Sequence, residues 1–372
     1  MNKITSHQLY RLITAHFAEI IREPAVIFWG VVFPILMAWG LGIAFTQKGE
    51  MHANMAIVKT YAGLDSTLET KLTGYLTVNG FKKDSTYSIG LKNEKLGNVS
   101  LTFFETTWSN AYTMLKKGKV SLVIEDRAND IKYHFDPANA EAKTAYQLVS
   151  GLAAYGPGFY AANQSDIEPL TLKGTRYVDF LIPGLLAMGI MMACSWGISY
   201  TIIDRRSKKL LRRMVATPMK KSNFLLALIT ARFAMTVAEA ALLFLFAWLY
   251  FGTKVQGSWS ALVVLFLAGN IAFSGISILI SSHTANPEVG NGIINALVTP
   301  MMVVSGVFFS YHNFPEWTLP FIKYLPLTMI ADSFRSIFNE GAGFAEVWRE
   351  ALLLTAIGTG SFVSGLKIFK WY

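Results

Sequence analysis

A short basic segment between two long apolar runs constrains this sequence more than any other feature. Residues 177–203 and 224–251 each exceed the roughly 20 residues that an α-helix needs to cross the hydrocarbon core of a bilayer. Residues 204–223 between them carry eight Lys and Arg side chains against the single acid Asp204. A short cationic loop between two spans stays on the cytoplasmic side of a membrane. The segment therefore predicts the orientation of the whole chain.

The composition supports an integral membrane protein. Of the 372 residues, 52% are hydrophobic and only 15% are charged, and a soluble protein of this size does not carry repeated apolar runs of spanning length. The net charge of +9 could indicate a nucleic-acid partner, but eight of the cations lie in one loop flanked by spans. We therefore expect a lipid bilayer and no nucleic acid. The only cysteine, Cys194, lies in an apolar run, which excludes a disulfide framework.

The apolar periodicity predicts the topology. Residues 5–22, within a segment 1–24, have one apolar face and predict a helix lying in the cytoplasmic interface. The predicted spans are 25–45, 177–203, 224–251, 259–281, 289–309 and 347–369. Six spans leave both termini in the cytoplasm, and every short cation-rich segment falls there too. We predict an α-helical protein of the plasma or bacterial inner membrane, with its later spans bundled across residues 177–369.

Residues 46–176 interrupt the apolar pattern with a polar segment that fits one extracytoplasmic α/β domain. Ser66 and Glu69 form a capping box for a helix that stops near Gly80. The other predicted elements are strands at 55–58, 101–104, 120–124 and 131–135, and helices at 109–117 and 139–154. This alternation predicts a small sheet covered by helices. His134 and Asp136 share a strand face, but nothing completes a metal or catalytic set, so we expect them to be structural.

Residues 310–346 are too polar and too often broken by proline to span the membrane. One interpretation is a set of short helices in the outer leaflet, or a partial re-entry into the membrane. An ordinary outer loop is the alternative. The candidate residues of this outer segment are Gly306, Pro315, Pro326, Asp332 and Arg335.

The sequence contains no motif for catalysis. It has no G-x-x-x-x-G-K-[ST] phosphate loop, and its six histidines are scattered without ligand spacing, so we expect neither an enzyme nor a metal site. Arg232 and Glu239 lie seven residues apart on one face of a predicted span, and charges there usually face the bundle interior or water. We predict that they contact a translocation path, with Asn270 as a further candidate. The alternative is that Arg232 extends to the nearby cytoplasmic headgroups.

Small residues spaced four apart predict close helix packing, within or between subunits. They are Ala268 and Ala272, Ser277 and Ser281, and Ala356, Gly360 and Ser364.

Short motifs in a fixed order give the chain a resemblance to a known family over nearly its whole length. They are Arg22-Glu23-Pro24, Phe33-Pro34-Ile35-Leu36, Asp179-Phe180-Leu181-Ile182-Pro183-Gly184, Ala216-Thr217-Pro218-Met219, Ser305-Gly306-Val307-Phe308-Phe309, Pro315-Glu316-Trp317, and Leu325-Pro326-Leu327 followed by Asp332 and Arg335. The chain resembles the membrane subunit of an ABC-2 type transporter, in the exporter branch with a large outer domain between the first two spans.

The resemblance implies partners for this chain. It implies a second membrane subunit, which we expect to be an identical copy, and two separate ATP-binding subunits that hold ATP and Mg. The first helix and the basic loop would receive the ATPase. The residues implied are Arg205, Arg206, Leu210, Leu211, Arg212, Arg213, Met214 and Pro218.

Three functions are compatible with this sequence. The first is ATP-driven export of an amphipathic, drug-like or lipid-linked substrate. The second is a membrane-anchored receptor or scaffold whose outer domain binds a ligand or partner without transport. An ion-coupled carrier, the third, would need more buried charge than Arg232 and Glu239 provide.

Overall fold

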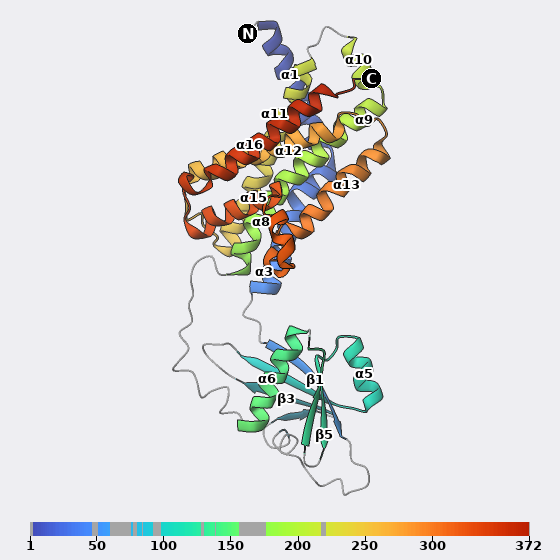
Figure 1. Cartoon of the computed structure of the whole chain (residues 1–372), viewed down its shortest axis with the longest axis vertical. Helices are drawn as coiled ribbons and strands as arrows, with labels where there is room; N and C mark the ends of the chain where they lie inside the picture. The colour runs from blue at the N-terminus through green and yellow to red at the C-terminus, as the bar shows by residue number, and fades with distance from the viewer. Residues whose placement is uncertain are drawn as a thin grey trace. The chain divides into compact units, whose positions relative to one another are not determined.

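The computed structural model describes residues 3–46, 51–59, 76, 80–83, 85–91, 98–127, 130–137, 139–155, 176–216 and 221–371 (Figure 1). The chain forms two compact units. The helical unit comprises Met1–Thr46 and Leu172–Tyr372, and the α/β unit comprises Gln47–Thr171.

The helical unit begins with the predicted amphipathic helix. Helix α1 covers Lys3–Arg22, and α2 (Pro24–Ile27) starts immediately after Glu23. Proline is favoured at the first position of a helix because its missing N–H would have no partner there. A π-helical turn, η1 (Phe28–Val32), then leads into α3 (Phe33–Thr46), so that the region of the first predicted span is helical throughout.

The next three helices follow the long apolar runs. They comprise α8 (Tyr177–Cys194), the π-helical η2 (Ser195–Tyr200) and α9 (Thr201–Ser207), then α11 (Lys221–Phe246) with the π-helical η3 (Ala247–Phe251), then α12 (Trp259–Ser281). Four helices in the described part of the chain are long and apolar enough to cross a membrane: Phe28–Phe45, Tyr177–Ser207, Lys221–Phe251 and Trp259–Ser281. The second extends four residues beyond its predicted end, so Arg205 and Arg206 lie on a helix rather than in a loop.

The remaining two long helices, α13 (Pro287–Val304) and α16 (Phe344–Lys367), are more polar. Helix α13 carries two asparagines and stops before the predicted residue 309, because Ser305 caps it and Gly306 follows with a left-handed φ of +73°. Helix α16 begins in a charged turn that includes Glu346 and Arg349. Because of these polar features, neither helix is counted among the four that are long and apolar enough to cross a membrane.

Helices α12 and α16 pack at backbone distance. A Cβ placed on Gly275 would lie 2.0 Å from the carbonyl oxygen of Gly358, and one on Gly365 would lie 2.9 Å from the Cα of Leu279. The four small residues predicted on α12 are all buried, as expected for close packing. Ala356, Gly360 and Ser364 of α16 are exposed and do not make this contact, so packing between subunits stays a prediction for them.

Short helices fill the polar segment between α13 and α16 (Figure 1). They are η4 (Tyr311–Asn313), η5 (Glu316–Thr318), α14 (Leu319–Lys323), α15 (Pro326–Arg335) and the π-helical η6 (Ser336–Glu340). Pro315 immediately precedes η5, and Pro326 is the first residue of α15. Both prolines therefore begin helices without interrupting any.

The α/β unit is a six-stranded mixed sheet with the order β2-β3-β4-β1-β5-β6. Its strands are β1 (Met51–Lys59), β2 (Phe81–Lys83), β3 (Thr86–Leu91), β4 (Val99–Glu105), β5 (Leu122–Arg127) and β6 (Asp130–His134). Strand β1 runs parallel to β4 and β5, and the other pairs are antiparallel. Strands β2 and β3 were not predicted from the sequence, and most of the helix predicted after Ser66 lies outside the described residues.

Two helices cover the two faces of this sheet, because side chains along a strand alternate between faces. Met55 and Ile57 of β1 share a core with α6 (Ala140–Tyr155). Ala56 and Val58 share one with α5 (Trp108–Lys116). His134 bonds to Glu125 of β5 at 3.1 Å and meets the Trp108 ring edge-on.

Candidate functional site

The basic segment forms two short helices joined by a tight turn. Some of its Arg and Lys side chains are buried or half-buried and others are exposed. Helix α9 ends at Ser207, Lys209 takes a left-handed conformation with φ of 57°, and α10 (Leu210–Val215) begins. Such a backbone conformation costs a non-glycine residue about 1–2 kcal/mol, so the surrounding contacts must hold it. We call residues 204–216 the basic turn.

Arg206 is turned inward, with only 4% of its surface exposed. Its Nη1 donates to the carbonyl oxygens of Ser281 and Thr284, its Nη2 to that of Ser282, and its Nε to that of Lys370 at 2.8 Å. A cation at the C-terminal end of α12 is favoured by the helix dipole and by the unpaired carbonyls there. Arg206 therefore caps a helix inside the protein, and its side chain is not free to contact an ATPase as the resemblance implied.

Arg205 joins the basic turn to α1. Its guanidinium pairs with the Glu19 carboxylate, donates to Nδ1 of His16 at 3.1 Å, and lies 5.6 Å above the centre of the Phe224 ring. The His16 and Phe224 rings are 5.7 Å apart. Because these side chains come from α1, α9 and α11, the junction couples the amphipathic helix to the basic turn and to the first turn of α11. No spacing in the sequence indicates a contact across this many residues.

Acidification should weaken this junction through His16. Burial and the neighbouring Arg205 lower the pKa of His16 from 6.5 to about 4, so the folded state favours the neutral imidazole that can accept from Arg205. A lowered histidine pKa means that the unfolded state binds more protons, so the stabilisation is present above pH 6.5 and is lost as the pH falls toward 4. We expect a loss of about 2 kcal/mol in the local opening free energy of α1 across this window.

Amide hydrogen exchange of residues 9–22, followed by mass spectrometry at several pH values, measures this loss. The variant His16→Gln keeps a hydrogen-bond acceptor but cannot be protonated in this range, so its opening free energy should stay flat. An equal pH slope in the wild type and in His16→Gln would contradict the role assigned to the imidazole.

The other residues predicted to contact an ATPase differ in how far they are exposed. Leu211 is fully buried and anchors α10, and Met214 is half-buried against the core of the helical unit. Leu210, Arg212 and Arg213 are exposed, and Pro218 lies outside the described residues. The exposed face of α10 therefore presents two cations beside an apolar side chain.

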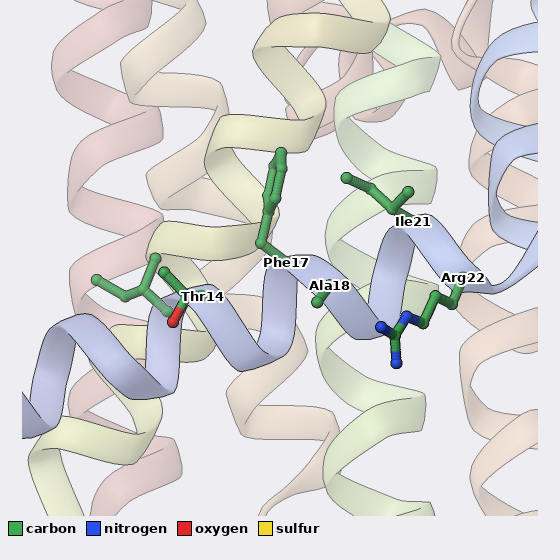
Figure 2. Close-up of a pocket in the computed structure, with 6 residues that line it drawn as sticks. Thr14, Phe17, Ala18, Ile21 and Arg22 are labelled. Carbon is green, nitrogen blue, oxygen red and sulfur yellow. The ribbon is translucent and has the colours of Figure 1, made fainter.

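Helix α1 retains an apolar face of its own. A shallow pocket of about 430 Å³ along it is lined mainly by Ile13, Phe17 and Ile21, with Arg22 at one end. Figure 2 shows Phe17 and Ile21 projecting from one side of the helix and Arg22 from the other. Both apolar side chains are more than one-third exposed, which suits a helix whose outer face meets lipid.

Arg232 and Glu239 form an ion pair inside the bundle. Their Nη2 and Oε1 atoms are 3.4 Å apart, and each residue is only 6% exposed. Two glycines make room for them: a Cβ on Gly197 of η2 would lie 2.5 Å from Nε of Arg232, and a Cβ on Gly30 of η1 would lie 2.5 Å from Oε1 of Glu239. Arg232 therefore faces the interior, and the alternative of a side chain reaching the headgroups is wrong. π-Helical turns such as η1 and η2 are frequent at functional sites.

Asn270 lies in a neighbouring polar layer between α8 and α12. Its amide nitrogen donates to the carbonyl oxygen of Phe266 at 2.8 Å, and its Oδ1 accepts from the thiol of Cys194 at 3.9 Å. Within the described residues, no hydrogen bond joins Asn270 to Arg232 or Glu239. The three predicted path residues are thus all buried, and the structure pairs two of them.

Arg335 fastens the outer segment to the start of α8. Its Nε donates to the carbonyl oxygen of Phe180 at 3.2 Å, its Nη2 to that of Gly306, and its Nη1 to Asp332 at 3.0 Å. Asp332 also accepts from the hydroxyl of Tyr311 at 2.9 Å. These bonds explain why Gly306, Asp332 and Arg335 stand out as motif residues, because together they fix the turn after α13 against α15 and α8.

A comparison with known families identifies the chain. The family model described as ABC-2 family transporter protein matches residues 24–367. No curated protein matches the chain. Among the described residues there is no group of three or more His, Cys, Asp or Glu side chains that could hold a metal ion.

Proposed function

Because the chain belongs to the ABC-2 family of transporter proteins, we propose that it is the membrane subunit of an ATP-driven exporter. It is a multi-pass membrane permease, and the energy for transport comes from a separate ATP-binding subunit that holds ATP and Mg. The substrate is an amphipathic, drug-like or lipid-linked molecule, because the spans contain few charges to accompany an ion.

The proposed topology has six spans, with α13 and α16 added to the four apolar helices. Helix α13 contacts α12 and the helix Tyr177–Ser207, and α16 fits against α12 at backbone distance. Packing of this kind supports a bundle in which polar positions face other helices. Residues 204–223 then lie in the cytoplasm with both termini, residues 46–176 lie outside the plasma or bacterial inner membrane, and two copies of the chain form the dimer.

The observation that carries the proposal is the division of cations in the basic turn. Arg205 and Arg206 are held by the chain's own α1 and by the end of α12, while Arg212 and Arg213 remain exposed on α10. A force applied to α10 by a partner would pass through α9 into the span that begins at Tyr177, and through Arg205 into α1. Closure of two ATP-binding subunits could thus rotate one bundle against the other and open the path outward.

Charge reversal on α10 tests this coupling. The double variant Arg212→Glu with Arg213→Glu should reduce the ATPase activity of the co-purified complex at least tenfold and leave the melting temperature of the membrane subunit unchanged, because both side chains are exposed. The matched control is Lys254→Glu with Arg349→Glu, two exposed cations on the side proposed to be outside.

Full ATPase activity in the Arg212→Glu, Arg213→Glu complex would contradict α10 as the coupling surface. The absence of any co-purifying ATPase from wild-type protein would instead favour the receptor or scaffold, whose outer domain would bind a partner without transport.

A further inference from the structure

A cavity of about 410 Å³ lies where α14, α15 and η6 meet the first turns of α16. Figure 1 shows α15 beside α16 in the helical unit. Part of the cavity wall is apolar, formed by Met329, Val347 and Leu353. A volume of this size is in the range of small-molecule sites, which combine apolar walls with a few polar groups.

The polar side of the cavity is strongly acidic. Four acidic residues, Asp332, Glu340, Glu346 and Glu350, line it, and Lys323 is the single basic residue in its lining. Two of these acids already have partners in the protein. Asp332 is bound by Arg335 and Tyr311, and Glu346 accepts from the backbone N–H of Gly343 at 2.7 Å.

Glu350 and Ser333 have no such partners. The Oε2 atom of Glu350 is buried and makes no hydrogen bond within the described part of the chain. Ser333 also lines the cavity, is only 5% exposed, and has a hydroxyl without a hydrogen bond to any described residue. Glu350 as a whole is half-buried, and a carboxylate oxygen or hydroxyl shielded from solvent without a partner is costly. Their presence beside a cavity indicates a group that arrives from outside the chain.

We propose that this cavity binds an organic cation, namely an ammonium group carried on a small apolar body. The ammonium donates to Glu350 and to the Ser333 hydroxyl, and the apolar body lies against Met329, Val347 and Leu353. The negative lining excludes anions, and the described residues do not group three metal-ligating side chains here. This binding does not depend on the proposed export, because it needs only the folded chain.

Isothermal titration calorimetry on the purified full-length chain in an uncharged maltoside detergent tests the site. The probe is 2-phenylethylammonium, and 2-phenylethanol is its uncharged counterpart of similar shape. The ammonium should bind at least tenfold more tightly than the alcohol. Glu350→Gln should weaken the ammonium at least tenfold, because it removes the charge and keeps the shape.

Glu316→Gln is the matched control, since Glu316 is an exposed acid of the same outer segment that does not line the cavity. It should change the affinity less than twofold. Ser333→Ala provides a second variant in case Glu350→Gln does not fold, as judged by size-exclusion chromatography, and should weaken the ammonium about threefold. Equal affinity for the amine and the alcohol, or wild-type affinity in the folded Glu350 and Ser333 variants, would overturn the proposal.

Discussion

Replacing Arg206 by alanine should lower the free energy of unfolding of the helical unit by about 3 kcal/mol or more. The change removes the donor to the carbonyl oxygens of Ser281, Ser282, Thr284 and Lys370 together. A buried acceptor left without a partner costs about 1–3 kcal/mol, and hydrogen bonds to a charged group are at the strong end of that scale. The loss should also release the C-terminal residues, because Arg206 lies over the ring of Phe369.

Thermal unfolding of purified protein in detergent, followed by tryptophan fluorescence, measures this effect. Arg212→Ala is the matched control, since Arg212 is exposed in the same basic turn and its loss should change stability by no more than about 0.5 kcal/mol. The loss of stability in Arg206→Lys should lie between those of Arg206→Ala and Arg212→Ala, because an ammonium cannot reach all the carbonyls that the planar guanidinium reaches. Equal melting temperatures for Arg206→Ala and Arg212→Ala would show that the cap contributes nothing.

The positions of the long helices could be predicted from the sequence, unlike the different roles of Arg206 and Arg212. The apolar runs predict the helices well because the length needed to cross a bilayer is fixed and an apolar run ends where charge begins. Helix α12 has the predicted bounds of 259 and 281, and α1 covers the predicted amphipathic stretch. The family match supports the same interpretation of the chain as a membrane permease.

The role of each cation could not be predicted in the same way. Arg206 and Arg212 look alike in the sequence, six residues apart in one basic segment. Their difference depends on the carbonyls of Ser282 and Lys370, which lie 76 and 164 residues away. Helix α9 also continues through Arg206, where the sequence suggested that a loop had begun. The helical backbone directs the guanidinium of Arg206 to the carbonyl oxygens at the C-terminal end of α12.

Packing faces were equally hard to assign from spacing alone. Helix α16 has small residues on more than one side, and the side that contacts α12 carries Gly358 and Gly365. In the α/β unit, β2 has only three residues, too few for a strand pattern to be recognised. Antiparallel pairing with β3 defines it, and that pairing is a tertiary property.

Removing either partner of the intramembrane pair should be about as damaging as losing Arg206. Arg232→Met leaves Glu239 buried without its counter-charge, and Glu239→Met does the same to Arg232, so each should cost about 3–5 kcal/mol. The double variant should recover most of that stability, because two apolar side chains of similar length can fill the same space between Gly30 and Gly197. The expected coupling energy is therefore large and favourable.

The double variant also separates stability from transport. The double variant Arg232→Met, Glu239→Met should have a nearly normal melting temperature. If Arg232 and Glu239 contact the translocation path, its substrate-stimulated ATPase activity in the co-purified complex should still be reduced at least tenfold. The control is Thr236→Val, which lies between them on α11 and loses only a hydroxyl bonded to the carbonyl oxygen of Arg232 at 2.9 Å. Normal stimulation in a stable double variant would assign the pair to packing alone, because a polar contact with the substrate cannot survive the loss of both charges.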